Sequence, residues 1–328
     1  MSTAAVTLPA PRRVHISGAD SNLGTRVLAR LAENPSLVDG SADDCDVVVH
    51  LGAADHDLRA RRRESVTTGA TAMLDEATLG DAGHLVLVSS AMVYGAWANN
   101  PVPLTETAVL RPDVGFVYAR QLATVEAMAD RWRRARPGRI VTVLRPVVAM
   151  AGDGTSRLAS ALATGLGQRF GEDDPPAQFL HLDDLASAVA LAVESQLDGV
   201  YNVAPDGWVA GDRVRALTGA RPRVQLPDRI AEVLATWRWQ FQRGPIPPGL
   251  RSYTREPWLV ANDRLKAHGW RPTVTNEQVY VEGTEARWWT MITPKRRQEL
   301  SLGAMVAGSL CAMFVVFSLV RRWRRRRR

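Results

Sequence analysis

The sequence predicts an α/β protein with a doubly wound parallel sheet, followed by one hydrophobic helix close to its C-terminus. Three observations lead to this prediction: short continuous apolar runs, helical segments between them, and one uncharged run at residues 301–320. Continuous apolar runs are typical of parallel strands that are buried on both faces. Strands that alternate with helices form parallel sheets through right-handed crossovers. The 328 residues are enough for one large domain of this class.

The predicted elements follow one another in a regular order. The apolar runs predict strands at 14–17, around 36–38, 46–51, 84–89, 140–145, around 179–180 and 200–203. Apolar residues at helical spacing predict helices at 22–33, 70–78, 118–134 and 183–195. After residue 205 the pattern becomes irregular and rich in Trp, Pro and Arg. This change predicts a small lobe packed over the C-terminal edge of the sheet.

The interval between the first helix and the strand at 46–51 is unusually short. Only 21 residues separate Gly24 from Asp46. A complete half of a doubly wound fold would place a strand, a helix and another strand in this interval. Only one short strand fits, so we expect a reduced sheet on this side.

The chain divides into five predicted segments. They are a disordered arm (1–12), a nucleotide-binding domain (13–293) with its substrate lobe at about 150–177 and 205–290, a linker (294–300), a transmembrane helix (301–320) and an Arg-rich tail (321–328).

The net charge and the cysteines exclude several functional classes. The formal net charge is +7, and residues 321–328 contain seven arginines, which account for all of it. The rest of the chain is neutral, which argues against a nucleic-acid-binding surface. The two cysteines, Cys45 and Cys311, lie far apart in the sequence, so we expect neither a disulfide framework nor a metal site.

A glycine-containing loop lies between the first strand and the first helix. It reads Ser-Gly-Ala-Asp-Ser-Asn-Leu-Gly over residues 17–24. Such a turn lets backbone N–H groups and a helix N-terminus approach a pyrophosphate. We therefore predict cofactor contacts from Gly18, Ser21, Asn22, Leu23 and Gly24. Taken alone, the loop is equally consistent with an ordinary strand-to-helix turn.

Further motifs occur in a fixed order along the chain. They are Asp-Val-Val-Val-His-Leu-Gly-Ala-Ala (46–54), Ser-Ser-Ala-Met-Val-Tyr-Gly (89–95), Pro-Leu-Thr-Glu (103–106), Leu-Arg-Pro (144–146), His-Leu-Asp-Asp-Leu-Ala (181–186), Tyr-Asn-Val (201–203) and Gly-Trp-Arg-Pro (269–272). With the loop, they resemble the extended short-chain dehydrogenase/reductase family of NAD-dependent epimerases and dehydratases. The resemblance covers roughly residues 13–275. It implies a Rossmann-type fold that binds NAD or NADP, without a metal.

The resemblance implies additional cofactor contacts. Leu51, Gly52 and Ala53 would line the adenine side, and Pro146 would lie beside the nicotinamide. Asp39 follows the short strand and is a candidate for bonding the adenosine ribose. We favour the interpretation that Asp39 is a loop residue that binds no ligand. Because this interval is truncated, the sequence does not distinguish NAD from NADP.

The catalytic block of the family is only partly present. The resemblance implies that Tyr118 is the general acid/base and that Ser90 polarises the substrate oxygen. The family places a lysine four residues after the tyrosine, on the same helix face, where its charge lowers the tyrosine pKa. This chain has Leu122 there, and Arg120 lies on a different face. Ser21 also replaces the middle glycine of the loop, which predicts crowding or a locally altered turn.

The C-terminal run predicts a membrane helix. Residues 301–320 contain 20 residues without a charge, which at about 1.5 Å each span a hydrocarbon core of about 30 Å. The arginines of 321–328 are expected to bind anionic lipid headgroups. We expect the globular part in the cytoplasm and leave the side of the tail open.

Two functions are compatible with these features. The first is a membrane-anchored NAD(P)-dependent oxidoreductase, epimerase or dehydratase that acts on a sugar-nucleotide, sterol-like or lipid-linked hydroxyl substrate. The alternative is a catalytically silent nucleotide-binding scaffold or sensor for a membrane partner, which the missing lysine favours. By resemblance, a homodimer is also plausible.

Overall fold

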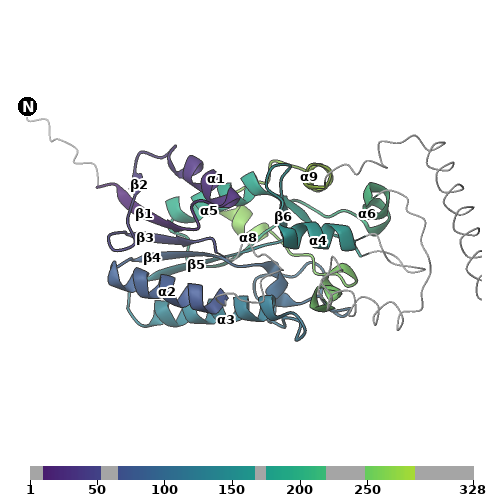
Figure 1. The fold of residues 1–328 in the computed structure, drawn as a ribbon, viewed down its shortest axis with the longest axis horizontal. Helices are drawn as coiled ribbons and strands as arrows, with labels where there is room; N and C mark the ends of the chain where they lie inside the picture. Colours follow the sequence, from purple (N-terminus) through teal and green to yellow (C-terminus); the bar gives the residue numbers. More distant parts are fainter. Residues whose placement is uncertain (1–9, 53–65, 167–174, 219–247, 285–328) are drawn as a thin grey trace, which may run out of the picture. The chain divides into compact units, whose positions relative to one another are not determined.

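Six strands of the described residues form a parallel sheet with the order β2-β1-β3-β4-β5-β8 (Figure 1). The computed structural model describes residues 10–52, 66–166, 175–218 and 248–284, all within a unit formed by Met1–Thr284. The strands are β1 (Arg12–Ser17), β2 (Leu37–Asp39), β3 (Val47–His50), β4 (His84–Val88), β5 (Ile140–Pro146) and β8 (Gly199–Val203). The predicted α/β class with a parallel sheet is confirmed.

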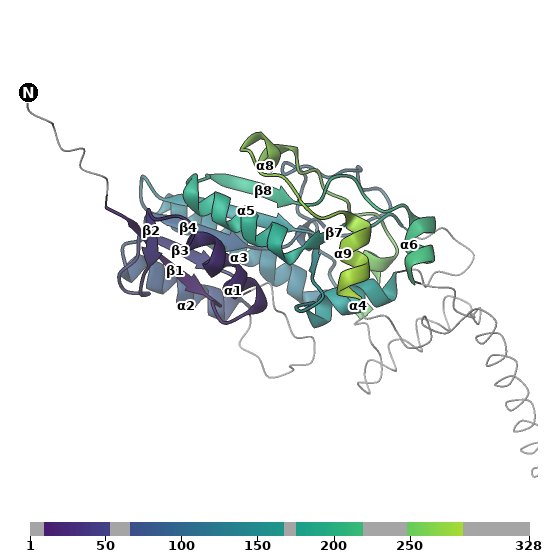
Figure 2. The ribbon, with the colours of Figure 1, turned by 90° about the horizontal axis from the view of Figure 1, so that it is seen from above.

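Two pairs of helices cover the two faces of the sheet (Figures 1 and 2). Helices α1 (Asn22–Leu31) and α5 (Leu182–Glu194) pack together on one face. Helices α2 (Val66–Leu79) and α3 (Val117–Arg134) pack together on the other. Every residue of β3 and β4 is buried as a result, which explains why these strands have no polar alternation.

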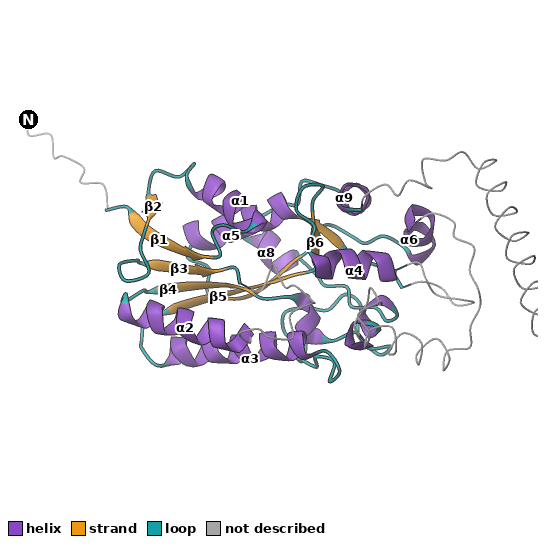
Figure 3. Cartoon of the chain, viewed as in Figure 1, coloured by secondary structure: helices purple, strands orange, loops and turns teal. Residues whose placement is uncertain are grey.

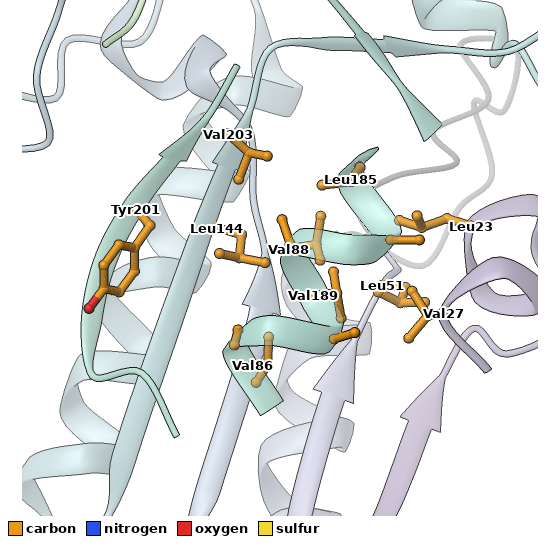
Figure 4. Close-up of a cluster of buried hydrophobic side chains, with 14 of the residues drawn as sticks. Leu23, Val27, Leu51, Val86, Val88, Leu144, Leu185, Val189, Tyr201 and Val203 are labelled. Carbon is orange, nitrogen blue, oxygen red and sulfur yellow. The ribbon is translucent and has the colours of Figure 1, made fainter. Parts of the chain in front are cut away.

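The core between the sheet and α1 and α5 is built from aliphatic side chains (Figure 4). Leu23 and Val27 of α1 and Val189 of α5 meet Val86 of β4 and Leu144 of β5. Leu23 and Val27 are four residues apart, so both lie on the face of α1 that packs against the sheet. This packing holds the N-terminus of α1 against the carboxyl ends of the strands.

The outer edge of the sheet at β2 is short. β2 has three residues, and its last residue, Asp39, is level with Val14 in the middle of β1. The chain then reaches β3 through residues 40–46 only. The expectation of one short strand in this interval is confirmed. The loop position expected for Asp39 is wrong, because Asp39 pairs within the sheet as the last residue of β2, and its role toward a ribose stays a prediction.

The described residues also form elements outside the main sheet (Figure 3). The strands β6 (Val148–Met150) and β7 (Phe179–His181) form a separate two-stranded parallel sheet. The strand expected around 179–180 is therefore present, but outside the main sheet. The remaining described helices are η1 (Ala91–Tyr94), α4 (Arg157–Gly165), α6 (Gly211–Thr218), η2 (Pro248–Leu250), η3 (Ser252–Thr254), α8 (Asp263–Ala267) and α9 (Asn276–Gly283).

The described ranges contain no helix that is both long enough and apolar enough to cross a membrane. The predicted transmembrane helix at 301–320, the linker at 294–300 and the Arg-rich tail at 321–328 lie outside the described residues, as does most of the arm at 1–12.

Candidate functional site

The loop between β1 and α1 adopts a backbone that requires its glycines. Gly18 has a φ of +92°, in the left-handed region that glycine adopts without strain. A Cβ atom on Gly24 would lie 2.3 Å from the carbonyl oxygen of Gly18. The two glycines therefore allow the helix to start directly against the end of the strand. The first N–H groups of an α-helix have no carbonyl partners within the helix, which makes the N-terminus of α1 suited to an anion.

Ser21 stabilises this loop instead of distorting it. Its φ of −74° and ψ of 161° are ordinary extended values, and it caps the N-terminus of α1. The Ser21 hydroxyl donates to the carbonyl oxygen of Gly18 at 2.7 Å and accepts from the backbone N–H of Gly24 at 3.0 Å. The expectation of an altered turn at this position is wrong, because a serine N-cap needs no left-handed backbone, and crowding of a bound phosphate stays a prediction.

Tyr118 and Ser90 reach the site from two different elements. Tyr118 lies at the start of α3, and its ring meets that of Phe116 edge to face at 5.8 Å. Ser90 caps the short helix η1 and accepts from the backbone N–H of Met92 at 3.2 Å. Leu122 follows Tyr118 by one turn of α3 and is only 1% exposed. The position of the family lysine is thus filled by an apolar side chain in the cluster that holds Met92 and Tyr118.

One cavity brings most of the predicted site residues together. It encloses about 650 Å³, including the part that is open to solvent. Its predicted members are Asn22, Leu23, Ser90, Tyr118 and Pro146. The N-terminus of α1 therefore faces the same space as the two candidate catalytic side chains. This is the crevice beyond the carboxyl ends of the strands, where the strand order reverses between β1 and β3.

The predicted adenine-side residues lie at different depths. Leu51 is buried beside the loop, and a Cβ on Gly18 would lie 3.5 Å from its Cβ atom. Gly52 is exposed next to it, and Ala53 lies outside the described residues. Asp39 is level with Val14, three ladder positions before Ser17. At about 3.3 Å per residue, this places the Cα atom of Asp39 roughly 10 Å before the end of β1.

A buried ion pair lies directly behind the cavity. Glu126 is 6% exposed and Arg145 is 4% exposed. The Arg145 Nη2 donates to Glu126 Oε2 at 2.6 Å, and its Nε donates to Glu126 Oε1 at 3.1 Å. The Ser89 hydroxyl also donates to Glu126 Oε1 at 2.6 Å. One carboxylate therefore joins α3 to the ends of β4 and β5, next to Ser90.

The network continues to the far edge of the sheet. The Arg145 Nη1 donates to the Tyr94 hydroxyl at 2.7 Å, and that hydroxyl donates to Asn202 Oδ1 at 2.8 Å. Burial raises the pKa of Tyr94, which keeps its hydroxyl protonated. Neither Glu126 nor Arg145 was assigned a role from sequence, although Arg145 lies in a quoted motif. A charged residue inside an apolar strand was the signal that could have identified the pair.

The chain matches a known family over more than half of its length. Residues 9–204 match the model of the NAD dependent epimerase/dehydratase family. A 3-diazoavenalumate denitrifying reductase from a Streptomyces species is 30% identical over 259 residues, which cover 71% of this chain and 77% of that protein. An uncharacterized protein of Mycobacterium tuberculosis is 26% identical over 237 residues. The aligned part spans 60% of this chain and 63% of that relative.

Solved structures share the fold at low sequence identity. The UDP-glucose 4-epimerase of Thermus thermophilus, in complex with NAD, superposes with a TM-score of 0.60 at 18% identity, covering 83% of this chain and 97% of the epimerase. RMD from Pseudomonas aeruginosa, in complex with NADPH, has a TM-score of 0.58 at 18% identity, covering 86% of this chain and all of that one.

Proposed function

The chain belongs to the NAD-dependent epimerase/dehydratase family, and from this premise we propose that it binds NAD or NADP and works as a reductase of a small substrate. A single observation carries the proposal. The cavity that contains Ser90 and Tyr118 also reaches the N-terminus of α1 at Asn22 and Leu23. A cofactor bound across α1 would thus place its nicotinamide beside the two hydroxyl groups.

The residues of the site fit one part of the cofactor well. Gly18, Gly24 and the Ser21 cap leave the N–H groups of Asn22 and Leu23 facing a pyrophosphate. Pro146 lines the cavity where the nicotinamide would lie. The adenosine side is less complete, because Asp39 ends well before the edge of the sheet. We therefore assign the binding free energy mainly to the pyrophosphate and nicotinamide contacts.

The hydroxyl groups of Ser90 and Tyr118 would both contact the substrate oxygen. A bound nicotinamide supplies or accepts hydride at C4. In a reduction, the substrate carbon gains the hydride, and its oxygen gains a proton from the Tyr118 hydroxyl. The Ser90 hydroxyl would donate a hydrogen bond to the same oxygen while it accepts from Met92. Solvent then returns the proton to Tyr118.

Leu122 favours the reductive direction of this reaction. A lysine at this position would stabilise the tyrosinate that removes a proton from an alcohol. Leu122 is buried and carries no charge, so Tyr118 is better suited to donate a proton than to accept one. Epimerisation and dehydration of sugars begin with alcohol oxidation in this scheme, and so we expect them to be slow. The name of the Streptomyces relative, a reductase, agrees with this direction.

Calorimetric titration of the full-length, detergent-purified protein with NAD, NADH, NADP and NADPH tests the proposal. We expect micromolar binding of at least one reduced cofactor. If a folded sample binds none of the four, the cofactor-dependent reductase is rejected, whereas binding without turnover of any substrate would support the silent nucleotide-binding scaffold or sensor that the missing lysine also allows.

We also propose that residues 301–320 anchor the protein in a membrane, with the globular part in the cytoplasm and residues 321–328 on anionic headgroups. The uncharged stretch of 20 residues and the seven arginines after it support this assignment. Alkaline carbonate extraction of membranes that contain the full-length protein is the test. Release of the protein into the soluble fraction would contradict an anchor.

A further inference from the structure

The segment 151–156, which we call the strap, joins β6 to α4 beside the candidate cofactor site. Its Gly154 lines the same cavity as Asn22 and Leu23 at the start of α1. A Cβ atom on Gly154 would lie 3.1 Å from Asn22 Nδ2 and 3.0 Å from Leu182 Cδ1 at the start of α5. The strap therefore packs on the first residues of both helices, with no room for one more carbon atom between them.

One arginine fastens the strap to both helices. Arg26, on the second turn of α1, donates from Nη2 to Asp153 Oδ1 of the strap and from Nε to Asp183 Oδ1 of α5, the latter at 2.7 Å. Its Nη1 donates to the carbonyl oxygen of Asn22 at 2.9 Å, which places the guanidinium beside the first turn of α1. The hydrogen bond from Arg26 holds the pKa of Asp153 below its usual value, so this ion pair is charged at neutral pH.

The end of the strap that leads into α4 is fixed in a different way. The Thr155 hydroxyl donates to the carbonyl oxygen of Gly283 at 3.0 Å, and Ser156 caps the N-terminus of α4. Within the described part of the chain, no hydrogen bond or ion pair except that of Arg26 with Asp153 ties the strap to α1. The Asp153 side chain is 74% exposed, so solvent and salt screen this ion pair. The contact with α1 is therefore easier to break than the anchors of Thr155 and Ser156.

We propose that the strap is a gate for the cofactor: the ion pair of Arg26 with Asp153 holds it shut, and it moves away from Asn22 when a dinucleotide enters or leaves. A pyrophosphate at the N–H groups of Asn22 and Leu23 would lie against Gly154, because Gly154 already contacts Asn22. A weak, exposed ion pair suits a segment that must open and close repeatedly. The inference rests on the proposed cofactor binding, which it deepens by naming the residues that control exchange.

A disulfide can lock the strap on α1 in the full-length protein in detergent. The Cβ atom of a residue at position 154 would lie 3.2 Å from Asn22 Cβ, near the distance of about 3.5–4.5 Å between disulfide-linked Cβ atoms. The variant therefore carries Asn22→Cys and Gly154→Cys, with Cys311→Ser to remove the competing thiol. NADH or NADPH added after oxidation should not bind, whereas cofactor added before oxidation should stay bound through gel filtration. Dithiothreitol should reverse both effects.

Asp153→Asn tests the ion pair without touching the cofactor loop, and it decides the matter if the reduced double-cysteine variant fails to fold or to bind. It should raise both the association and the dissociation rate of NADH or NADPH by about twofold or more, because the gate opens more often. It should also remove the rise of both rates with salt that we expect of the parent protein. Stopped-flow nicotinamide fluorescence measures these rates. Asp130→Asn is the matched control, since it removes an exposed ion pair near the far end of α3 and should change neither rate.

The outcomes separate the gate from the proposed function. A folded parent protein that binds neither NADH nor NADPH would reject the reductase and the gate together. A parent that binds cofactor, with equal uptake by the oxidised and reduced double-cysteine variant or with unchanged rates in Asp153→Asn, would overturn the gate alone. Hydrogen exchange of the amides of 151–156 adds a measurement without cofactor: it should be faster in Asp153→Asn than in the parent, and equal exchange would show that the ion pair does not hold the strap.

Discussion

At the scale of single residues, Leu122 decides how the site can use Tyr118. It lies one helical turn after Tyr118 and is buried among apolar side chains. Position 122 therefore supplies no cation that would favour a tyrosinate. The exchange of lysine for leucine thus reduces the fraction of the base form that an alcohol oxidation needs at neutral pH, while the protonated form that a reduction uses predominates.

Leu122→Lys should move the rate profile for oxidation of 4-phenyl-2-butanol to lower pH and raise the rate at pH 7 by about tenfold or more. The lysine cation lowers the pKa of a neighbouring tyrosine, so a larger fraction becomes the base. Initial rates of NADH or NADPH formation from pH 6 to 10 measure this. Leu122→Met is the control and should leave the profile unchanged. An unchanged profile in the lysine variant would mean that Tyr118 does not exchange the proton.

Glu126→Gln should lower the free energy of unfolding by about 3–5 kcal/mol, since it leaves the buried charge of Arg145 without its partner. Urea unfolding measures the change. The double variant Glu126→Gln with Arg145→Met should recover part of the loss. Glu277→Gln is the control, because its ion pair with Arg213 is exposed and screened by solvent, so its loss should change stability far less. Equal losses from both glutamates would contradict a structural role for the buried pair.

At the scale of elements, the junction of β1 and α1 has no room for a side chain at Gly24. Gly24→Ala should weaken cofactor binding at least tenfold, because the new Cβ would lie 2.3 Å from the Gly18 carbonyl oxygen and push the helix away from the strand. Gly83→Ala is a matched control, since a Cβ there meets nothing within 4 Å. Calorimetry on both variants is the measurement. Normal binding by a folded Gly24→Ala protein would remove the loop from the cofactor site.

The outer edge of the sheet shows how an element limits a site. β2 ends level with the middle of β1, and residues 40–46 lead directly to β3. The edge therefore carries no acidic side chain from β2 at the height of the Gly18 loop. Because β2 ends there, Asp39 is a strand residue whose Cα atom lies before the crevice.

At the scale of the whole molecule, two buried histidines make stability depend on pH. Burial lowers the pKa of His50 and of His84 to about 4. Both groups bind protons more readily in the unfolded chain, where the pKa is about 6.5. Each therefore contributes stability that is fully present above pH 6.5 and is lost as the pH falls toward 4.

The expected loss is about 3 kcal/mol for each histidine over this interval. His84→Gln should reduce the slope of stability against pH between 6.5 and 4 by about one proton, since glutamine does not titrate and can still reach Thr142. Urea unfolding at a series of pH values measures the slope. A slope that is the same in the variant and in the parent protein would show that His84 is not the titrating group.

The succession of strands and helices along the chain could be predicted from sequence because the signals for each element are local. Continuous apolar runs such as 46–51 and 84–89 report burial on both faces, and the actual strands β3 and β4 lie inside them. Gly18 and Gly24 could be assigned because the close approach of strand and helix depends on the absence of a side chain. Leu122 could be recognised as a departure from the family motif because that motif places its lysine four residues after the tyrosine.

The rest was decided by contacts between residues that are distant in the sequence. Glu126 and Arg145 became partners because α3 packs on β5, and Ser21 became a helix cap because of the backbone of its loop. Residues of β7, α4 and the segment around Trp258 pack side by side, and no local pattern links these elements. Periodicity reports which face of an element is buried. Which buried faces meet, and what space remains between them, depends on the packing of the whole chain.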